Sequence, residues 1–227
     1  EFQPRLTPTP AFDERAFHDL DLLIRKAGEH GLRVALRVGF IWSFRPDAEL
    51  PNAMRVDAAF HDPAAHRAWL DFVAEVCRRV CASPHVVLGF LSWEDLFPFN
   101  LLGDAPNRDH LGFRREFVGW LREHHELADV GAKYGRTFAT WAEVLVPERR
   151  SPAYEYVLAW WDDALVERFF LPARQRFPRL SFEARVDWDP VWRGERIDWY
   201  RHDVVLRRTG AEAATVYYAV AWGMKND

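Results

Sequence analysis

The sequence predicts an α/β protein whose parallel strands are joined by helical crossovers, and a (β/α)8 (TIM) barrel is the architecture it favours. Apolar runs typical of strands alternate with stretches of helical periodicity along the chain. The glycine-rich turns of dinucleotide-binding and P-loop sheets are absent, whereas the loops after the strands are long and aromatic, as on the active face of a barrel. Only about five strands are recognisable, so we expect a single domain over residues 1–227 that forms an incomplete or truncated barrel.

The composition narrows the class of partner. The 227 residues are ample for one core, and a net charge of −4 without a basic patch argues against nucleic acid. No run approaches the roughly 20 apolar residues of a membrane span. No signal peptide is visible; removal of one would fit a secreted or periplasmic protein, and compartment and oligomeric state stay open. The 11 tryptophans exceed what a core of this size needs. Such an excess often lines a cleft that stacks on flat ligands, sugars among them, and the alternative is packing.

The N-terminal part predicts a strand at residues 1–8, a helix at 13–30 and a strand at 32–40. The helix is expected to end at Gly31 and to bury a face of apolar side chains at helical spacing, namely Phe17, Leu20, Leu23, Ile24 and Ala27.

The next helix is expected to begin at Asp62-Pro63, an N-cap residue followed by a first-turn proline. It runs to about Cys81, and Ser83-Pro84 stops it. Its inward side chains are predicted to be Trp69, Val73, Val76 and Val80. An apolar strand begins directly afterwards at Val86.

Cys77 and Cys81 are the two cysteines of the chain and lie four residues apart, on one face of this helix. We expect them to act as small buried hydrophobic residues. A disulfide within one helical turn is disfavoured, because the Cα separation and the side-chain directions rarely suit it. A metal pair would need nearby histidines, which the local sequence does not supply.

The C-terminal part predicts three helices and two strands. One helix follows residue 108, with Phe113, Phe117, Trp120 and Leu121 on one side, and a short helix covers 126–133. A long helix starts at Ser151-Pro152 and covers AYEYVLAWWDDALVERFFL, which ends at Leu171. A strand is expected at 180–189, helix-like sequence at 194–210, and a last strand at 214–224.

The strand that begins at Val86 runs into two adjacent acids, Glu94 and Asp95, flanked by aromatic residues. Such polar ends of parallel strands are where α/β folds place their sites. Glu94, beside Trp93 and Phe97, would be partly desolvated, and desolvation keeps a carboxyl group protonated near neutral pH, as a general acid requires. The alternative is a surface acid that caps the following turn.

Strand 180–189 carries charged side chains on one face, which would point into a barrel while the apolar face meets the helices. Glu183 is expected to pair with Arg185 or Arg37, because buried charges need partners. Asp187 lies nearer the open end and is a candidate for ligand contact. Candidate sugar platforms are Trp42, Trp93, Trp141, Trp188 and Trp222, although any one such tryptophan is more often a core residue than a ligand contact.

Three stretches together resemble the clan of retaining (β/α)8-barrel glycoside hydrolases, which includes cellulases and β-galactosidases. FDERAFHDLDLLIRKAGEHGLRVALRV resembles the clan's second helix and third strand, and DPAAHRAWLDFVAEVCRRVCASPHVVLGFLSWED resembles its third helix and fourth strand. FRREFVGWLREHH followed by KYGRTFATWAEV is similar to the WL…YG…W pattern found after that strand in families acting on β-galactosides. The resemblance covers roughly residues 1–150.

This resemblance implies that Glu94 is the acid/base of a two-carboxylate retaining glycosidase acting on a poly- or oligosaccharide. The residues considered as substrate contacts are Arg37, Trp42, Trp93, Asp95, Trp141, Asp187, Trp188 and Trp222. No cofactor or metal is implied. The sequence departs from the clan at Trp93, where an asparagine that contacts the sugar usually stands. The clan's nucleophile lies on the seventh strand, and by this count TVYYAVAWG is only the sixth. The alternative is a non-catalytic carbohydrate-binding or assembly module on a degenerate barrel.

Overall fold

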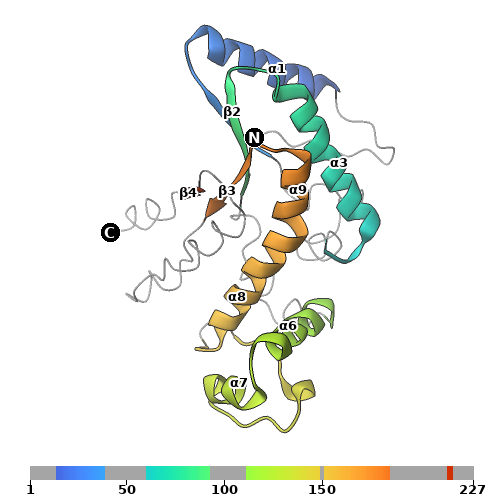
Figure 1. Cartoon of the computed structure of the whole chain (residues 1–227), viewed down its shortest axis with the longest axis vertical. Helices are drawn as coiled ribbons and strands as arrows, with labels where there is room; N and C mark the ends of the chain where they lie inside the picture. The colour runs from blue at the N-terminus through green and yellow to red at the C-terminus, as the bar shows by residue number, and fades with distance from the viewer. Residues whose placement is uncertain (1–13, 39–59, 93–110, 149–150, 185–213, 217–227) are drawn as a thin grey trace.

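The computed structural model describes residues 14–38, 60–92, 111–148, 151–184 and 214–216. They form a parallel sheet with helices packed on one face and a helical extension beyond one end (Figure 1). The predicted strand 1–8, the helix-like stretch 194–210 and the distal parts of the strands predicted at 180–189 and 214–224 lie outside these residues.

The four strands of the sheet are β1 (Val34–Arg37), β2 (Val86–Ser92), β3 (Leu180–Ala184) and β4 (Ala214–Val216). Their spatial order is β1-β2-β3-β4, and all three pairings are parallel. Order in space therefore follows order in sequence, without the reversal that defines a doubly wound sheet. Among the described strands, this is the order of an arc of a (β/α)8 barrel.

The helices alternate with these strands as the sequence predicts. Their bounds are α1 (Glu14–Glu29), α3 (Pro63–Val80), α6 (Leu111–His124), α7 (Leu127–Tyr134), a short 3-10 turn η3 (Trp141–Glu143), α8 (Tyr154–Leu165), a π-helical segment η4 (Val166–Phe170) and α9 (Leu171–Arg176). Within the described part of the chain, none of these helices is long and apolar enough to cross a membrane.

Local signals in the sequence fix the ends of α1 and α3. Gly31 follows α1 with a φ of 71°, a conformation that glycine adopts without a steric penalty. Asp62 accepts a hydrogen bond from the Ala64 N–H at 2.8 Å, and Pro63 occupies the first helical position. Both predicted boundaries are confirmed.

The predicted inward face of α1 is wrong at one residue. Phe17, Leu20 and Ile24 are buried, but the Leu23 side chain is 61% exposed. Leu23 is rotated by about 100° from Ile24 around the helix axis. Because only a narrow stripe of side chains along α1 is buried, a side chain at this angle from Ile24 is exposed to solvent.

The helix predicted from Ser151-Pro152 is longer than expected. α8, η4 and α9 follow one another without a break, so the helix passes through Pro172 and ends at Arg176. Proline lacks an N–H and clashes with the carbonyl one turn earlier in a regular helix. The π-helical turn at Val166–Phe170 widens the backbone just before Pro172, which is how the helix continues past it.

The core lies between the sheet and the pair formed by α3 and α8–α9. Trp69 and Phe72 on α3 are fully buried, as are Phe170 and Phe177 from the other helix and its end. Along β1, β2 and β3, successive side chains point to opposite faces of the sheet. One set of alternate residues therefore faces the helices, and the other set faces away from them.

Residues 111–148, which we call the helical unit, stand beyond the carboxyl ends of the strands. The α8–α9 helix is about 34 Å long, whereas β3 spans about 17 Å. Because α9 leads directly into β3, the surplus length of α8 extends past the carboxyl edge of the sheet. α6 and α7 pack on that extension (Figure 1).

Candidate active face at the carboxyl ends of the strands

The carboxyl edge of the parallel sheet is the candidate active face, because β1, β2 and β3 all end there. β2 is flanked by β1 and β3 and ends at Ser92. The predicted acid/base Glu94 follows two residues later in the chain, outside the described residues. The other predicted site residues outside the described part of the chain are Trp42, Trp93, Asp95, Asp187, Trp188 and Trp222.

Arg37 is the predicted site residue that the structure places on the sheet itself. It is half-buried on β1 and is in register with Phe90, which is in turn in register with Ser181. Neighbouring residues in register on parallel strands point to the same side. Arg37 therefore lies on the face opposite Gly89 and the helices, which is the face that would line a barrel interior.

Glu183 follows Ser181 by two residues on β3. It is in register with Ser92 on β2 and with Thr215 on β4. Its backbone thus stands beside the last residue of the strand that leads to Glu94. Ser181 is buried, and its hydroxyl oxygen has no partner among the described residues, so this face contains polar groups as the strand pattern predicts.

Trp141 lies on a different part of the molecule from the strand ends. It begins the short turn η3 in the helical unit and packs partly buried against the core. The neighbouring Arg114 on α6 fixes this turn by donating to the Ala142 carbonyl at 2.8 Å and to the Val144 carbonyl at 3.3 Å. This placement does not bring Trp141 together with Arg37.

A hollow of about 370 Å³ also lies on the helical unit, lined by Tyr134, Phe138 and Glu143 among others. Its polar groups serve the local fold. The Tyr134 hydroxyl donates to the Leu145 carbonyl at 2.7 Å, and burial raises the pKa of that phenol. Glu143 accepts from the Thr140 N–H and closes the capping box of η3.

No pattern in the sequence predicts the charged network centred on Glu116 of α6. Its Oε1 atom is 2.8 Å from Nε2 of His61 and 2.7 Å from a guanidinium nitrogen of Arg168. Arg168 also donates to the Phe60 carbonyl at 3.1 Å and lies over the Phe60 ring. We call Glu116, His61 and Arg168 the Glu116 network.

The Glu116 network lies on the carboxyl-end side of the sheet. α3 leads into β2, so the start of α3, where His61 stands, is at that end. Burial acts to raise the pKa of Glu116, but the hydrogen bond from His61 and the charge of Arg168 outweigh it, and the net shift is downward. Glu116 is therefore a fixed negative charge joining three segments.

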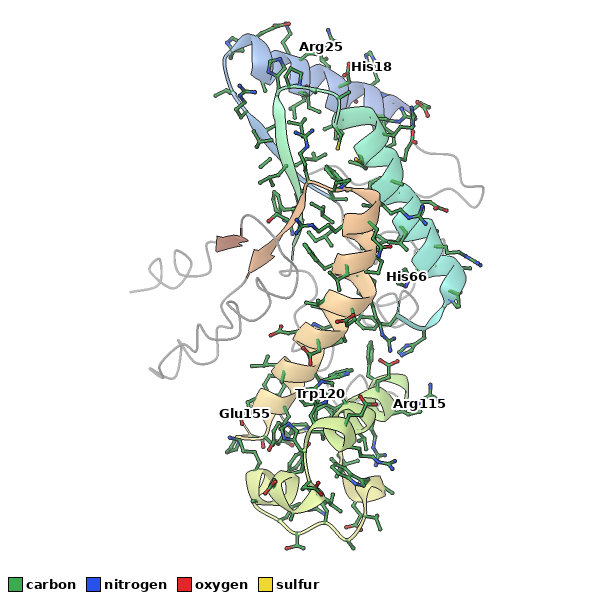
Figure 2. The ribbon with its side chains drawn as sticks, viewed as in Figure 1. His18, Arg25, His66, Arg115, Trp120 and Glu155 are labelled. Atoms are coloured by element: carbon green, nitrogen blue, oxygen red, sulfur yellow. The ribbon has the colours of Figure 1, made fainter. Side chains whose placement is uncertain are left out.

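His66 lies one turn into α3 and faces the α8–α9 helix, where its ring stacks on Phe169 with centroids 5.5 Å apart (Figure 2). Its Nε2 atom is buried without a hydrogen-bond partner among the described residues. Burial, and then the charge of Arg168, lower the pKa of His66. The folded protein thus favours the neutral ring.

The helical unit is held to α8 by polar contacts as well as by packing. The Trp120 indole N–H donates to Oδ2 of Asp163 at 2.8 Å, and Lys133 lies 2.6 Å from Glu155 (Figure 2). These contacts hold the helical unit on the part of α8 that extends past the carboxyl edge of the sheet. Within the described ranges, no group of three histidine, cysteine or acidic side chains could hold a metal ion.

Comparison with known proteins supports the fold. No protein-family model and no curated protein matches the chain. Among solved structures, the β-galactosidase from Bacillus circulans sp. alkalophilus is similar with a TM-score of 0.55 at 13% identity over 91% of this chain. A catalytic mutant of Gan42B, a GH42 β-galactosidase from G. stearothermophilus, is similar with a TM-score of 0.50 at 14% identity over 76% of this chain.

These neighbours are TIM-barrel glycoside hydrolases, and the chain shares the fold of part of them. It spans only 32% and 28% of their respective lengths. At such low identity, the likeness concerns the fold alone. It agrees with the clan-level resemblance of the sequence.

Proposed function

We propose that this chain carries the acid/base half of a retaining glycoside hydrolase site, with Glu94 as the acid/base. The observation that carries the proposal is the position of β2. It is an interior strand of a parallel, sequentially ordered sheet, and Glu94 follows its carboxyl end by two residues. Catalytic groups of barrel enzymes lie at such strand ends.

In this mechanism the Glu94 carboxyl group gives its proton to the glycosidic oxygen as the bond to the sugar breaks. A second carboxylate attacks the anomeric carbon and forms a glycosyl-enzyme intermediate. Glu94, now ionised, takes a proton from the water that releases the sugar. The second carboxylate is not assigned to a residue of this chain.

The proposed substrate is a poly- or oligosaccharide that lies across the carboxyl edge of the sheet. Arg37 on the inner face would orient the reacting carboxyl group or the sugar. Asp95 and Asp187 would accept hydrogen bonds from sugar hydroxyls. Stacking would come from the tryptophans named in the sequence, namely Trp42, Trp93, Trp141, Trp188 and Trp222.

The test compares Glu94→Gln with Asp95→Asn, its neighbour of the same charge, on aryl β-D-galactosides and a panel of other aryl glycosides. Loss of a general acid lowers the rate roughly 10²–10⁴-fold. A substrate whose phenol leaves without protonation should lose much less in the first step. Asp95→Asn should act on KM and reproduce neither the size of the loss nor its dependence on the leaving group.

Full activity in Glu94→Gln would remove Glu94 from the mechanism. Oligosaccharide binding without turnover, unchanged in Glu94→Gln, would instead support a non-catalytic carbohydrate-binding module on this fold. The replacement of the clan's usual asparagine by Trp93 is the feature that favours this second reading.

A further inference from the structure

Cys77 and Cys81 lie close together at the end of α3, near the amino ends of the strands and therefore at the opposite edge of the sheet from the candidate active face. Cys77 lies in the last turn of the helix, and Cys81 is its C-cap residue. The N–H of Cys81 donates to the Cys77 carbonyl at 2.9 Å, so the turn that joins them is closed. Their Sγ atoms are 2.8 Å apart, and both side chains are thiols in this structure.

The two free thiols agree with the expectation that a bridge here is disfavoured, but the α-carbon separation does not exclude one. Helix dimensions put α-carbons four residues apart at about 6.2 Å, and disulfides span roughly 4.4–6.8 Å. The separation is near the upper limit but inside the range. The two side chains already point toward each other, which was the second requirement.

The surroundings leave the pair accessible while holding the backbone in place. Both cysteines are half-buried and pack against the edge of the core. The Arg179 guanidinium, just before β3, donates to the Cys81 carbonyl at 2.6 Å and to the Val86 carbonyl at 3.2 Å. Closing a bond between the sulfurs also requires the last turn of α3 to tighten, because β-carbons one helical turn apart lie about 5–6 Å from each other and a disulfide holds them about 3.5–4.5 Å apart.

Burial raises the pKa of the Cys77 thiol to about 12, and the hydrogen bond with Cys81 acts in the same direction. The thiolate is the species that attacks a disulfide, so a step through Cys77 is slow at neutral pH. The chain has no other cysteine, so any intramolecular disulfide joins these two residues.

We propose that Cys77 and Cys81 are a redox-active dithiol that a low-molecular-weight disulfide converts into an intrahelical disulfide. One thiolate attacks the small disulfide, forms a mixed disulfide and releases one small thiol. The other thiolate then attacks the protein-bound sulfur, forms the Cys77–Cys81 bond and releases the second small thiol. The two protein thiols are oxidised, the small disulfide is reduced by two electrons, and both protons leave on the small thiols.

The test treats the full chain, reduced and freed of reductant, with oxidised glutathione for several hours. The remaining thiols are then alkylated with iodoacetamide, and the intact mass is measured. The wild type should lose both alkylation sites and two hydrogens, carry no glutathione and remain a monomer on a non-reducing gel. Dithiothreitol should restore both sites.

Cys77→Ser and Cys81→Ser are matched controls, because each removes only the partner thiol. Each should stop as a protein with one bound glutathione, and the double variant should take none. Wild-type protein that ends with two glutathiones, forms interchain dimers or keeps two alkylatable thiols would overturn the proposal. These outcomes are read on the wild type, so they do not depend on the folding of the variants.

Discussion

Glu116 is the side chain through which α6 contacts both the start of α3 and the π-helical segment. Glu116→Gln would leave Arg168 and His61 facing a neutral amide, with one charge-assisted acceptor lost. Because the Glu116 side chain is only 17% exposed, solvent compensates incompletely. We expect the free energy of unfolding to fall by about 1–3 kcal/mol, measured by urea denaturation.

The matched control is Glu123→Gln, a change of the same chemistry on the exposed face of the same helix. It should alter the free energy of unfolding by less than about 0.5 kcal/mol. Equal effects of the two substitutions would mean that the Glu116 network contributes no more than a surface charge.

His66 should make stability depend on pH. Its folded-state pKa lies below the ordinary value of 6.5, so the unfolded chain binds this proton more readily. The neutral His66 ring makes its full contribution to the free energy of unfolding above about pH 6.5. This contribution is lost as the pH falls through the lowered pKa of His66 in the folded protein. Thermal unfolding of wild type and His66→Phe between pH 7.5 and 5 checks this, since the variant should have the shallower slope.

The Arg78 hydrogen bond lowers the pKa of Glu75 to about 2. Carboxylates of this kind lose their contribution to the free energy of unfolding at a pH below the range in which His66 titrates. They therefore do not obscure the window assigned to His66. A variant with the slope of the wild type across that window would show that another group controls it.

At the scale of single residues, the sequence could place Glu94 after a strand but could not find the Glu116 network. Glu94 stands directly after an apolar run, a local signal. Glu116 lies 55 residues from His61 and 52 from Arg168. No periodicity in one sequence connects positions so far apart, because their proximity follows from how α3, α6 and η4 pack.

At the scale of elements, Gly89 sets how closely β2 approaches the end of α9. A Cβ added there would lie 2.7 Å from Cε1 of Phe177 and 3.3 Å from Cγ2 of Val38. Phe177 is fully buried and cannot move aside freely. Gly89→Ala should therefore lower the free energy of unfolding by about 1–3 kcal/mol through overpacking, as measured by chemical denaturation.

Gly119, in the middle of α6, is the contrasting position. A Cβ there would meet nothing within 4 Å. Alanine has the higher helix propensity, so Gly119→Ala should raise the free energy of unfolding by about 0.5–1 kcal/mol. Shifts of the same sign in both variants would contradict the packing assigned to β2.

The sequence predicted elements well where chain-local chemistry determines them. The Asp62 side chain caps the start of α3, and Gly31 ends α1 because glycine adopts a positive φ without a steric penalty. Leu23 was placed inward because periodicity does not reveal how wide a buried stripe is. The passage of the helix through Pro172 depends on the π-turn, for which the sequence contains no simple signal.

At the scale of the molecule, alternation of strands and helices predicted a parallel sheet, and the structure confirms one with sequential order. The absence of glycine-rich turns favoured a barrel over a doubly wound sheet, and the order of the four described strands, which shows no reversal, agrees with this. The predicted site residues around Glu94 stay predictions. Except for Arg37 and Trp141 they lie outside the described residues, and local sequence patterns do not encode how side chains from different strand ends are placed relative to one another.

The sequential sheet also determines when each strand can find its neighbour as the chain leaves the ribosome. Val34 on β1 and Val86 on β2 are in register and about 50 residues apart, whereas Gly89 waits about 90 residues for Leu180 on β3. The helical unit emerges during that interval, but partners of its side chains on α8, such as Asp163 and Glu155, emerge after it. The edge of β2 that pairs with β3 therefore stays unpaired until about residue 180 has emerged, and an unpaired strand edge can pair with other nascent chains.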